Sequence, residues 1–205
     1  MRAPTNLVLD PELLARARGG DRDALSIILD HYYERIHRML VHLVGRSPEL
    51  DDLRQQVLLT IVRGIAGFRG DSELGTWIGG ICVNVSREHI RGKRTAKKRN
   101  VDDGQPAIDL SAGPDVVARI ESRAELIAVE RALATLSIEQ RAAFVLATVY
   151  GHSVDEIAAI MKAARSTTRL RLYYGRKKFR AALARQHGDT ATQDDGAEPA
   201  KEGPL

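Results

Sequence analysis

Apolar residues recur every three or four positions along much of the chain, a spacing that places their side chains on one face of an α-helix. The clearest run extends from Asp21 to Leu43, and a second extends from Leu50 to Phe68. Gly45, Ser47 and Pro48 lie between the two runs and favour a turn. The pattern therefore predicts two successive amphipathic helices.

Residues typical of helix ends add two more helices to this N-terminal part. Asp10 and Pro11 predict a short leading helix, with aspartate as the N-cap and proline at the first helical position. After a turn at Gly70, Ser72 is the expected cap of a fourth helix that carries an apolar stripe from Leu74 to Ile90. This helix continues into a run of lysine and arginine, so we expect it to end as a basic arm.

The C-terminal part has the same helical periodicity from about Ile120 to Leu136. Two capping boxes follow, Ser137–Gln140 and Ser153–Glu156, and each predicts the start of a further helix. A last helix is expected from Ser166. No segment has the alternating pattern of a β-strand, so the predicted fold class is all-α.

The helical periodicity disappears between the two parts, where glycine and proline lie among aspartates. Such a segment is too long for an ordinary loop inside one compact domain. We therefore expect two small helical domains, residues 10–95 and 119–187, joined by an acidic flexible linker at 96–118. The composition of residues 188–205 predicts a disordered tail.

Composition narrows the class of protein. The 205 residues are 43% hydrophobic, enough for two small cores, and the net charge is +4, with the cations clustered as on proteins that bind nucleic acid. Cys82 is the only cysteine, and its place between Ile81 and Val83 favours a core position. Neither a signal-peptide core nor an apolar stretch of about 18 residues occurs, so we expect a cytoplasmic protein without membrane insertion.

The segment from Ser153 to Arg185 is the strongest candidate site, because a short helix, a tight turn and a basic helix form a helix-turn-helix. In such a unit the start of the second helix meets base edges in the major groove, and later cations meet phosphates. The alternative is a solvated basic helix of an ordinary bundle. The candidate base readers are Arg165, Ser166, Thr167 and Arg169, and the candidate phosphate contacts are Arg171, Arg176 and Lys177.

Two weaker signals lie in the N-terminal part. Trp77 and the basic arm combine an aromatic ring with cations, which suits single-stranded DNA, although a core tryptophan explains Trp77 equally well. The polar face of Asp51, Asp52, Gln55 and Gln56 suits a basic helical partner, with a solvated surface as the alternative. The six histidines lack zinc-ligand spacing and no glycine-rich loop precedes a helix, so we predict no enzyme, catalytic residue, metal or cofactor.

Taken together, these motifs resemble the extracytoplasmic-function (ECF) sigma factors of the sigma-70 family. The segments Leu53–Leu59 and Phe68–Ser72, and Trp77 with Asn84, are similar to the region 2 signature of that family. Leu136–Arg141 and Ser153–Ala158 resemble its region 4. The resemblance extends from about residue 10 to residue 185.

The resemblance implies a factor that directs RNA polymerase to promoters and starts transcription there. It implies that Asp51, Asp52, Gln55, Gln56 and Leu59 bind core polymerase, which the family contacts through the β′ clamp helices and the β subunit. It also implies an anti-sigma protein as a partner, and the helix from Ser166 as the reader of the minus-35 duplex. Residues implied for the unpaired minus-10 strand are Phe68, Arg69, Asp71, Ser72, Trp77, Asn84, Arg91, Lys93 and Arg94.

Some positions depart from the family pattern. Gln56 stands where the family usually has glutamate, and Lys162 replaces the customary turn glycine, so a left-handed backbone there would be strained. Gly75, Gly79 and Gly80 replace larger side chains, which predicts a weaker helix, at about 1 kcal/mol for each glycine, and lost DNA contacts. Two alternatives therefore remain: a dimeric helix-turn-helix regulator, and a sigma-like protein that has lost promoter opening.

Overall fold

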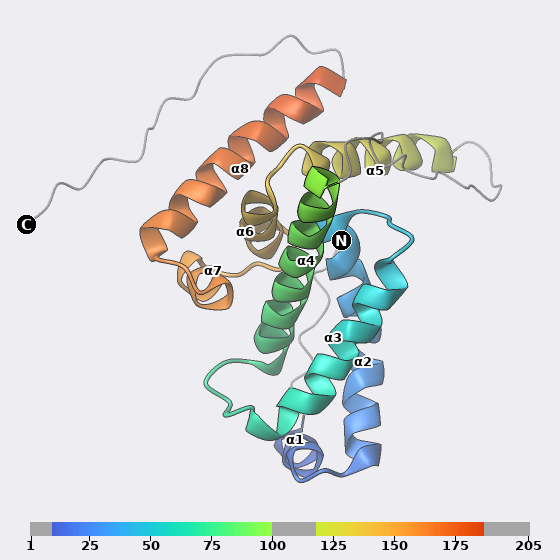
Figure 1. The fold of residues 1–205 in the computed structure, drawn as a ribbon, viewed down its shortest axis with the longest axis vertical. Coiled ribbons are helices and arrows are strands. Elements are labelled where there is room, and N and C mark those ends of the chain that lie inside the picture. The colour runs from blue at the N-terminus through green and yellow to red at the C-terminus, as the bar shows by residue number, and fades with distance from the viewer. Residues whose placement is uncertain (1–9, 100–117, 187–205) are drawn as a thin grey trace, which may run out of the picture.

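The computed structural model describes residues 10–99 and 118–186, and these residues fold entirely into helices and connecting turns, as the all-α prediction requires. Figure 1 shows an N-terminal unit, α1 to α4, beside a C-terminal unit, α5 to α8. The predicted tail at 188–205 and most of the predicted linker lie outside the described residues. The helices are α1 (Pro11–Arg18), α2 (Arg22–Val44), α3 (Leu50–Gly64), the 3-10 turn η1 (Ile65–Gly67), α4 (Leu74–Arg99), α5 (Ala118–Ala134), α6 (Ile138–Thr148), α7 (Val154–Met161) and α8 (Arg165–Gln186).

Most of the predicted helix starts are confirmed. The side chain of Asp10 accepts a hydrogen bond from the amide of Glu12, and Asp21 caps α2 in the same way. The cap predicted at Ser72 is wrong, because α4 begins at Leu74 and the carbonyl of Glu73 accepts its first helical hydrogen bonds. The Ser72 hydroxyl donates instead to that same carbonyl, at 3.4 Å.

The glycines of α4 lie against neighbouring helices. A Cβ atom built on Gly75 would lie 3.4 Å from Nη1 of Arg35, and one on Gly79 would lie 3.6 Å from Cε of Met39, both on α2. Gly80 faces α7, where the carbonyl oxygen of Ile160 would be 3.9 Å away. A side chain at Gly75 or Gly79 would therefore meet α2 rather than DNA, which contradicts the expectation that these glycines remove DNA contacts.

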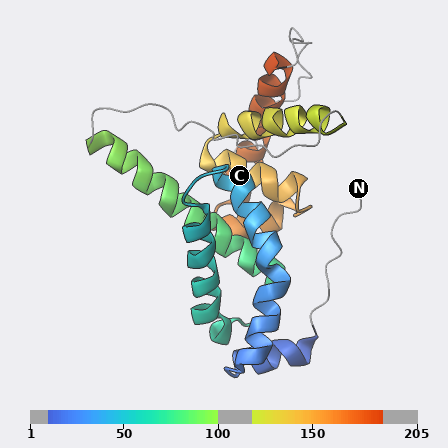
Figure 2. The ribbon, with the colours of Figure 1, turned by 90° about the vertical axis from the view of Figure 1, so that its right-hand side faces the viewer.

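The two units share one hydrophobic core. Val83 of α4, Leu146 of α6 and Ile157 of α7 are almost completely buried and belong to a single continuous cluster. Figure 1 shows α4 between α3 and the helices of the C-terminal unit, and Figure 2 shows the C-terminal part of α4 projecting away from the other helices. Cys82 is fully buried in this core, and burial raises the pKa of its thiol to about 12, so the predicted core position is confirmed.

A tight turn joins α7 to α8. The two predicted capping boxes are present, with Ser137 paired to Gln140 and Ser153 paired to Glu156. Lys162 ends α7 in the left-handed conformation, with φ 49° and ψ 50°, as the comparison with the family predicted. A residue with a Cβ atom pays a steric penalty in this conformation, so the turn stores strain.

Replacing Lys162 with glycine should therefore stabilise the chain. Because glycine adopts the left-handed region freely, Lys162→Gly should raise the free energy of unfolding by about 1 kcal/mol, measured by urea denaturation. Lys162→Ala is the matched control, since alanine keeps the Cβ atom and removes the same charge. An equal gain in both variants would show that charge, and not backbone strain, determines the effect.

Candidate nucleic-acid and protein interfaces

The start of α8 presents every predicted base reader to solvent. Arg165, Ser166, Thr167 and Arg169 are all exposed, whereas Thr168 is fully buried against the rest of the C-terminal unit. An ion pair of 2.9 Å between Arg165 and Asp155 of α7 links the two helices at the turn. The helix-turn-helix therefore has an exposed polar face at the position from which major-groove contacts are made.

The predicted phosphate contacts differ in their environment. Arg176 and Lys177 are exposed on α8 and available to a polyanion. Arg171 is only 27% exposed, and its Nη1 lies 3.3 Å from Oε2 of Glu139 on α6. A phosphate contact by Arg171, as predicted, would require it to leave this carboxylate, a cost that its place in the sequence did not predict.

The polar face predicted on α3 is fully accessible. Asp51, Asp52, Gln55, Gln56 and Leu59 are all exposed, while the opposite side of the helix is buried in the core. Leu59 is 46% exposed. An exposed apolar residue ringed by polar groups is typical of a surface that binds another protein.

Sequence reasoning missed one member of this surface. Val62 follows Leu59 by about one helical turn and is 41% exposed, so the two side chains extend the same apolar patch. The sequence did contain a signal for this patch: Leu59 and Val62 are apolar, lie three residues apart and fall outside the buried stripe of the helix.

The residues predicted for the minus-10 strand divide into a buried pair and an exposed group. Phe68 is only 5% exposed and packs on Trp77, with ring centroids 5.3 Å apart. Trp77 in turn lies against Gly64 of α3, where a Cβ atom would be 3.1 Å from the indole. The two rings therefore anchor the loop that follows α3 in the core, while Arg69, Asp71, Ser72 and Asn84 are exposed around them.

The basic arm is the C-terminal part of α4. Arg91 and Lys93 are exposed, and the side chain of Arg94 lies outside the described part of the chain. Lys93 pairs with Glu49 at 3.0 Å. The pKa of Glu49 is lowered to about 2, first by a hydrogen bond from Ser47 and then by Lys93, so this carboxylate stays charged and holds the arm near the start of α3.

Partly buried cations join the two helical units. Nη2 of Arg87 on α4 lies 2.6 Å from Oε2 of Glu139, and its Nη1 donates to the carbonyl of Met161 at 3.3 Å. Arg141 of α6 donates to the carbonyl of Leu43 on α2 at 2.8 Å, and burial lowers the pKa of its guanidinium to about 10. These polar contacts fix the orientation of the C-terminal unit on the shared core.

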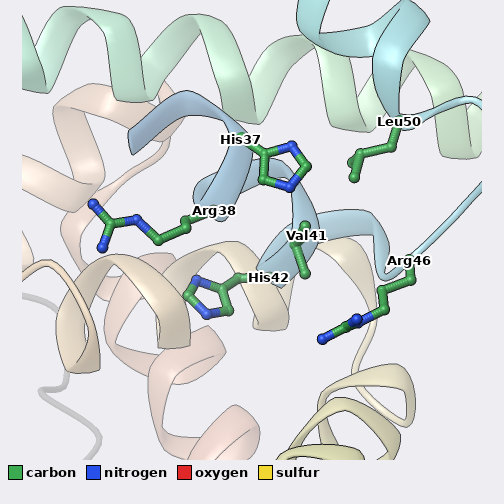
Figure 3. A pocket seen from close by; sticks show the side chains of 6 residues that line it. All are labelled: His37, Arg38, Val41, His42, Arg46 and Leu50. Atoms are coloured by element: carbon green, nitrogen blue, oxygen red, sulfur yellow. The ribbon is translucent and has the colours of Figure 1, made fainter. Parts of the chain in front are cut away.

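A cationic hollow of about 390 Å³ lies beside this junction. Figure 3 shows side chains of α2 and of the turn after it around the hollow, with Leu50 of α3. Burial lowers the pKa of His42, the charge of Glu130 raises it, and Arg38 lowers it further. The lining residues are His37, Arg38, Val41, His42, Arg46 and Leu50.

Other kinds of site are absent from the described residues. Within 10–99 and 118–186, no three histidine, cysteine, aspartate or glutamate side chains come together as metal ligands. In the same ranges, every helix is too short or too polar to cross a bilayer. A helix-turn-helix with an exposed polar face, an exposed face with an apolar centre on α3 and a basic arm are the surfaces expected of a transcription initiation factor.

Comparison with known proteins agrees with this class. Residues 28–96 match the family model for sigma-70 region 2, and residues 126–179 match the model for sigma-70 region 4. The chain is 33% identical over 180 residues to the ECF RNA polymerase sigma factor SigM of Mycobacterium tuberculosis, an alignment that covers 87% of this chain and 85% of the relative. It is 28% identical over 183 residues to the RNA polymerase sigma-H factor of Pseudomonas aeruginosa, an alignment that covers 85% of this chain and 93% of the relative.

Solved structures share the fold. CnrH, solved in complex with the cytosolic domain of CnrY, superimposes with a TM-score of 0.61 at 21% identity, covering 85% of this chain and 96% of the other. The sigma factor RpoE of Bartonella quintana superimposes with a TM-score of 0.60 at 23% identity, covering 77% of this chain and 95% of the other. The chain belongs to the ECF sigma factors of the sigma-70 family, which direct RNA polymerase to specific promoters.

The histidines predict how stability depends on pH. Burial is the largest cause that lowers the pKa of His42, His89 and His152 in the folded chain. The unfolded chain therefore binds more protons than the folded chain below the ordinary histidine pKa of about 6.5. The contribution of the neutral histidines to the free energy of unfolding should be complete above about pH 6.5. This contribution should be lost as the pH falls further.

Urea denaturation between pH 7.5 and pH 5.5 measures this slope. Carboxylates with a lowered pKa, such as Glu49 and Glu156, are ionised in the folded chain and almost fully ionised in the unfolded chain across this range, so they add little slope. The variants His42→Gln and His152→Gln should each flatten the dependence. A wild-type slope that neither variant reduces would assign the pH dependence to other groups.

Proposed function

We propose that three surfaces of this sigma factor divide the work of initiation. Asp51, Asp52, Gln55, Gln56 and Leu59, extended by Val62, dock on core polymerase through the β′ clamp helices. Support comes from the exposure of all six residues on α3 while the other side of the helix is buried. An apolar centre with a polar rim suits a protein partner.

The loop after α3 and the basic arm hold the unpaired minus-10 strand. Arg69, Asp71, Ser72 and Asn84 contact the strand directly, while Phe68 and Trp77 position the loop from below. Arg91, Lys93 and Arg94 follow the strand backbone, since cations along a groove track phosphates. Binding energy to the open strand offsets the cost of unpairing, so the chain acts by binding alone and performs no catalysis.

The first turns of α8 read the minus-35 duplex. Arg165, Ser166, Thr167 and Arg169 meet base edges, and Arg171, Arg176 and Lys177 neutralise phosphates. The observation that carries this assignment is the exposed polar face of α8 opposite its buried side. Since polymerase and promoters are its targets, the chain works in the cytoplasm.

A protein inhibitor is the remaining partner. The two similar solved structures hold their sigma factors with CnrY and with the anti-sigma factor NepR. We assign a protein of the anti-sigma class to this chain as well, covering surfaces that polymerase or promoter DNA would otherwise use.

Run-off transcription tests the function as a whole. Core polymerase supplied with this chain and the promoter upstream of its own gene should start transcripts at one position. Core binding without an open complex would identify a sigma-like protein that has lost promoter opening. Binding of duplex DNA as a dimer, without core, would identify an ordinary regulator.

Charge at the centre of the α3 face should weaken the polymerase complex. Leu59→Asp should raise the dissociation constant for core polymerase by about tenfold or more, because it places a charge in a desolvated contact. Ile27→Asp is the matched control, since Ile27 is a 53% exposed apolar residue on α2, outside this face. Equal loss in both variants, measured by fluorescence anisotropy, would contradict a docking site on α3.

Removing a phosphate contact should change the salt dependence of promoter binding. Arg176→Ala and Lys177→Ala should each reduce the slope of log K against log salt concentration by about 0.9. Arg22→Ala, on α2 of the other unit, should leave the slope unchanged. Unaltered slopes in the two α8 variants would show that these cations stay solvated in the complex.

A further inference from the structure

The exposed face of α8 has an apolar residue at its centre. At about 100° per residue, Thr168, Leu172 and Gly175 define the buried side of the helix. On the opposite side, Leu170 lies about 40° around the helix from Ser166 and about 20° from Lys177. Leu170 is 44% exposed, in line with this placement.

The surroundings of Leu170 are polar or cationic. On the exposed face, Thr167 and Ser166 lie three and four residues before it and Lys177 lies two turns after it, and the proposed function assigns all three to DNA. Tyr174, one turn further along and 49% exposed, has its ring held edge-on against Tyr173 at 5.2 Å. Leu170 therefore points outward among the groups that approach the duplex.

The chemistry of the major groove limits what a leucine can recognise there. Base edges present hydrogen-bond donors and acceptors, together with one apolar group, the C5 methyl of thymine. A leucine side chain can neither donate nor accept, so against any other base it would desolvate a polar edge without replacing its hydrogen bonds. Contact with a thymine methyl buries apolar surface on both sides.

We propose that Leu170 is a specificity-determining residue that selects thymine in the minus-35 duplex through the C5 methyl group. This inference rests on the proposed function of α8 and adds an apolar contact to its polar readers. Leu170 lies in the first two turns of the helix, from which base edges are reached. Its exposure means that the folded structure does not depend on its side chain.

Replacing thymine with uracil tests this contact at the level of one methyl group. Holoenzyme, assembled from core polymerase and this chain, first selects its minus-35 element from a randomised duplex pool. Each thymine of the selected element is then replaced by uracil, which keeps every hydrogen-bonding group and loses only the methyl. At one position the wild-type dissociation constant should rise about fourfold, as expected for one buried methyl group.

Variants assign the effect to Leu170. With Leu170→Ser, the ratio of uracil to thymine dissociation constants at that position should fall to about one. With Tyr174→Ser, a matched change at the other exposed large hydrophobic residue of α8, the ratio should stay near fourfold. A ratio that persists in Leu170→Ser would overturn the proposal.

Two further outcomes separate the inference from the function on which it rests. Failure of the holoenzyme to select any element would contradict the proposed reading of the minus-35 duplex. Selection of an element that lacks thymine, or that tolerates uracil at every position, would leave that function standing and reject the role of Leu170. The exposed leucine would then be a contact for a protein partner.

Discussion

One carboxylate connects the helices that carry both proposed DNA-binding surfaces. Glu139 of α6 pairs with Arg87 of α4 at 2.6 Å and with Arg171 of α8 at 3.3 Å. Removing Glu139 would leave both guanidinium groups without this partner, whereas removing either arginine would leave Glu139 paired with the other. Glu139 therefore acts together with the shared hydrophobic core to set the relative placement of α4 and α8.

The arrangement separates the contacts within the chain from those proposed with polymerase. The C-terminal unit packs on α2 and α4, through Arg141, Arg87 and the carbonyls of Leu43 and Met161. The exposed residues of α3 take no part in these contacts. Docking on polymerase through α3 is therefore compatible with the packed state, whereas Arg171 must give up Glu139 before it can bind a phosphate.

Local chemistry explains which features the sequence could predict. The capping boxes at Ser137 and Ser153 depend on neighbouring residues, so short patterns identified them, whereas the left-handed backbone at Lys162 was expected from the turn glycine of the family. The predicted cap at Ser72 was wrong because the path of the loop before α4 determines at which residue the helix begins. The pairing of Glu139 with Arg87, and the packing of Gly75 and Gly79 on α2, join residues far apart in the chain and leave no local signal.

The burial of Cys82 has a consequence for work with this protein. A thiol with a pKa of about 12, closed off on all sides, has almost no thiolate at neutral pH and no path for a reagent. Since it is the only cysteine in the chain, the folded protein should offer no thiol to oxidants or alkylating agents. A cysteine introduced on the surface would therefore be the only one to react with a thiol-specific label, and Cys82 would not have to be replaced first.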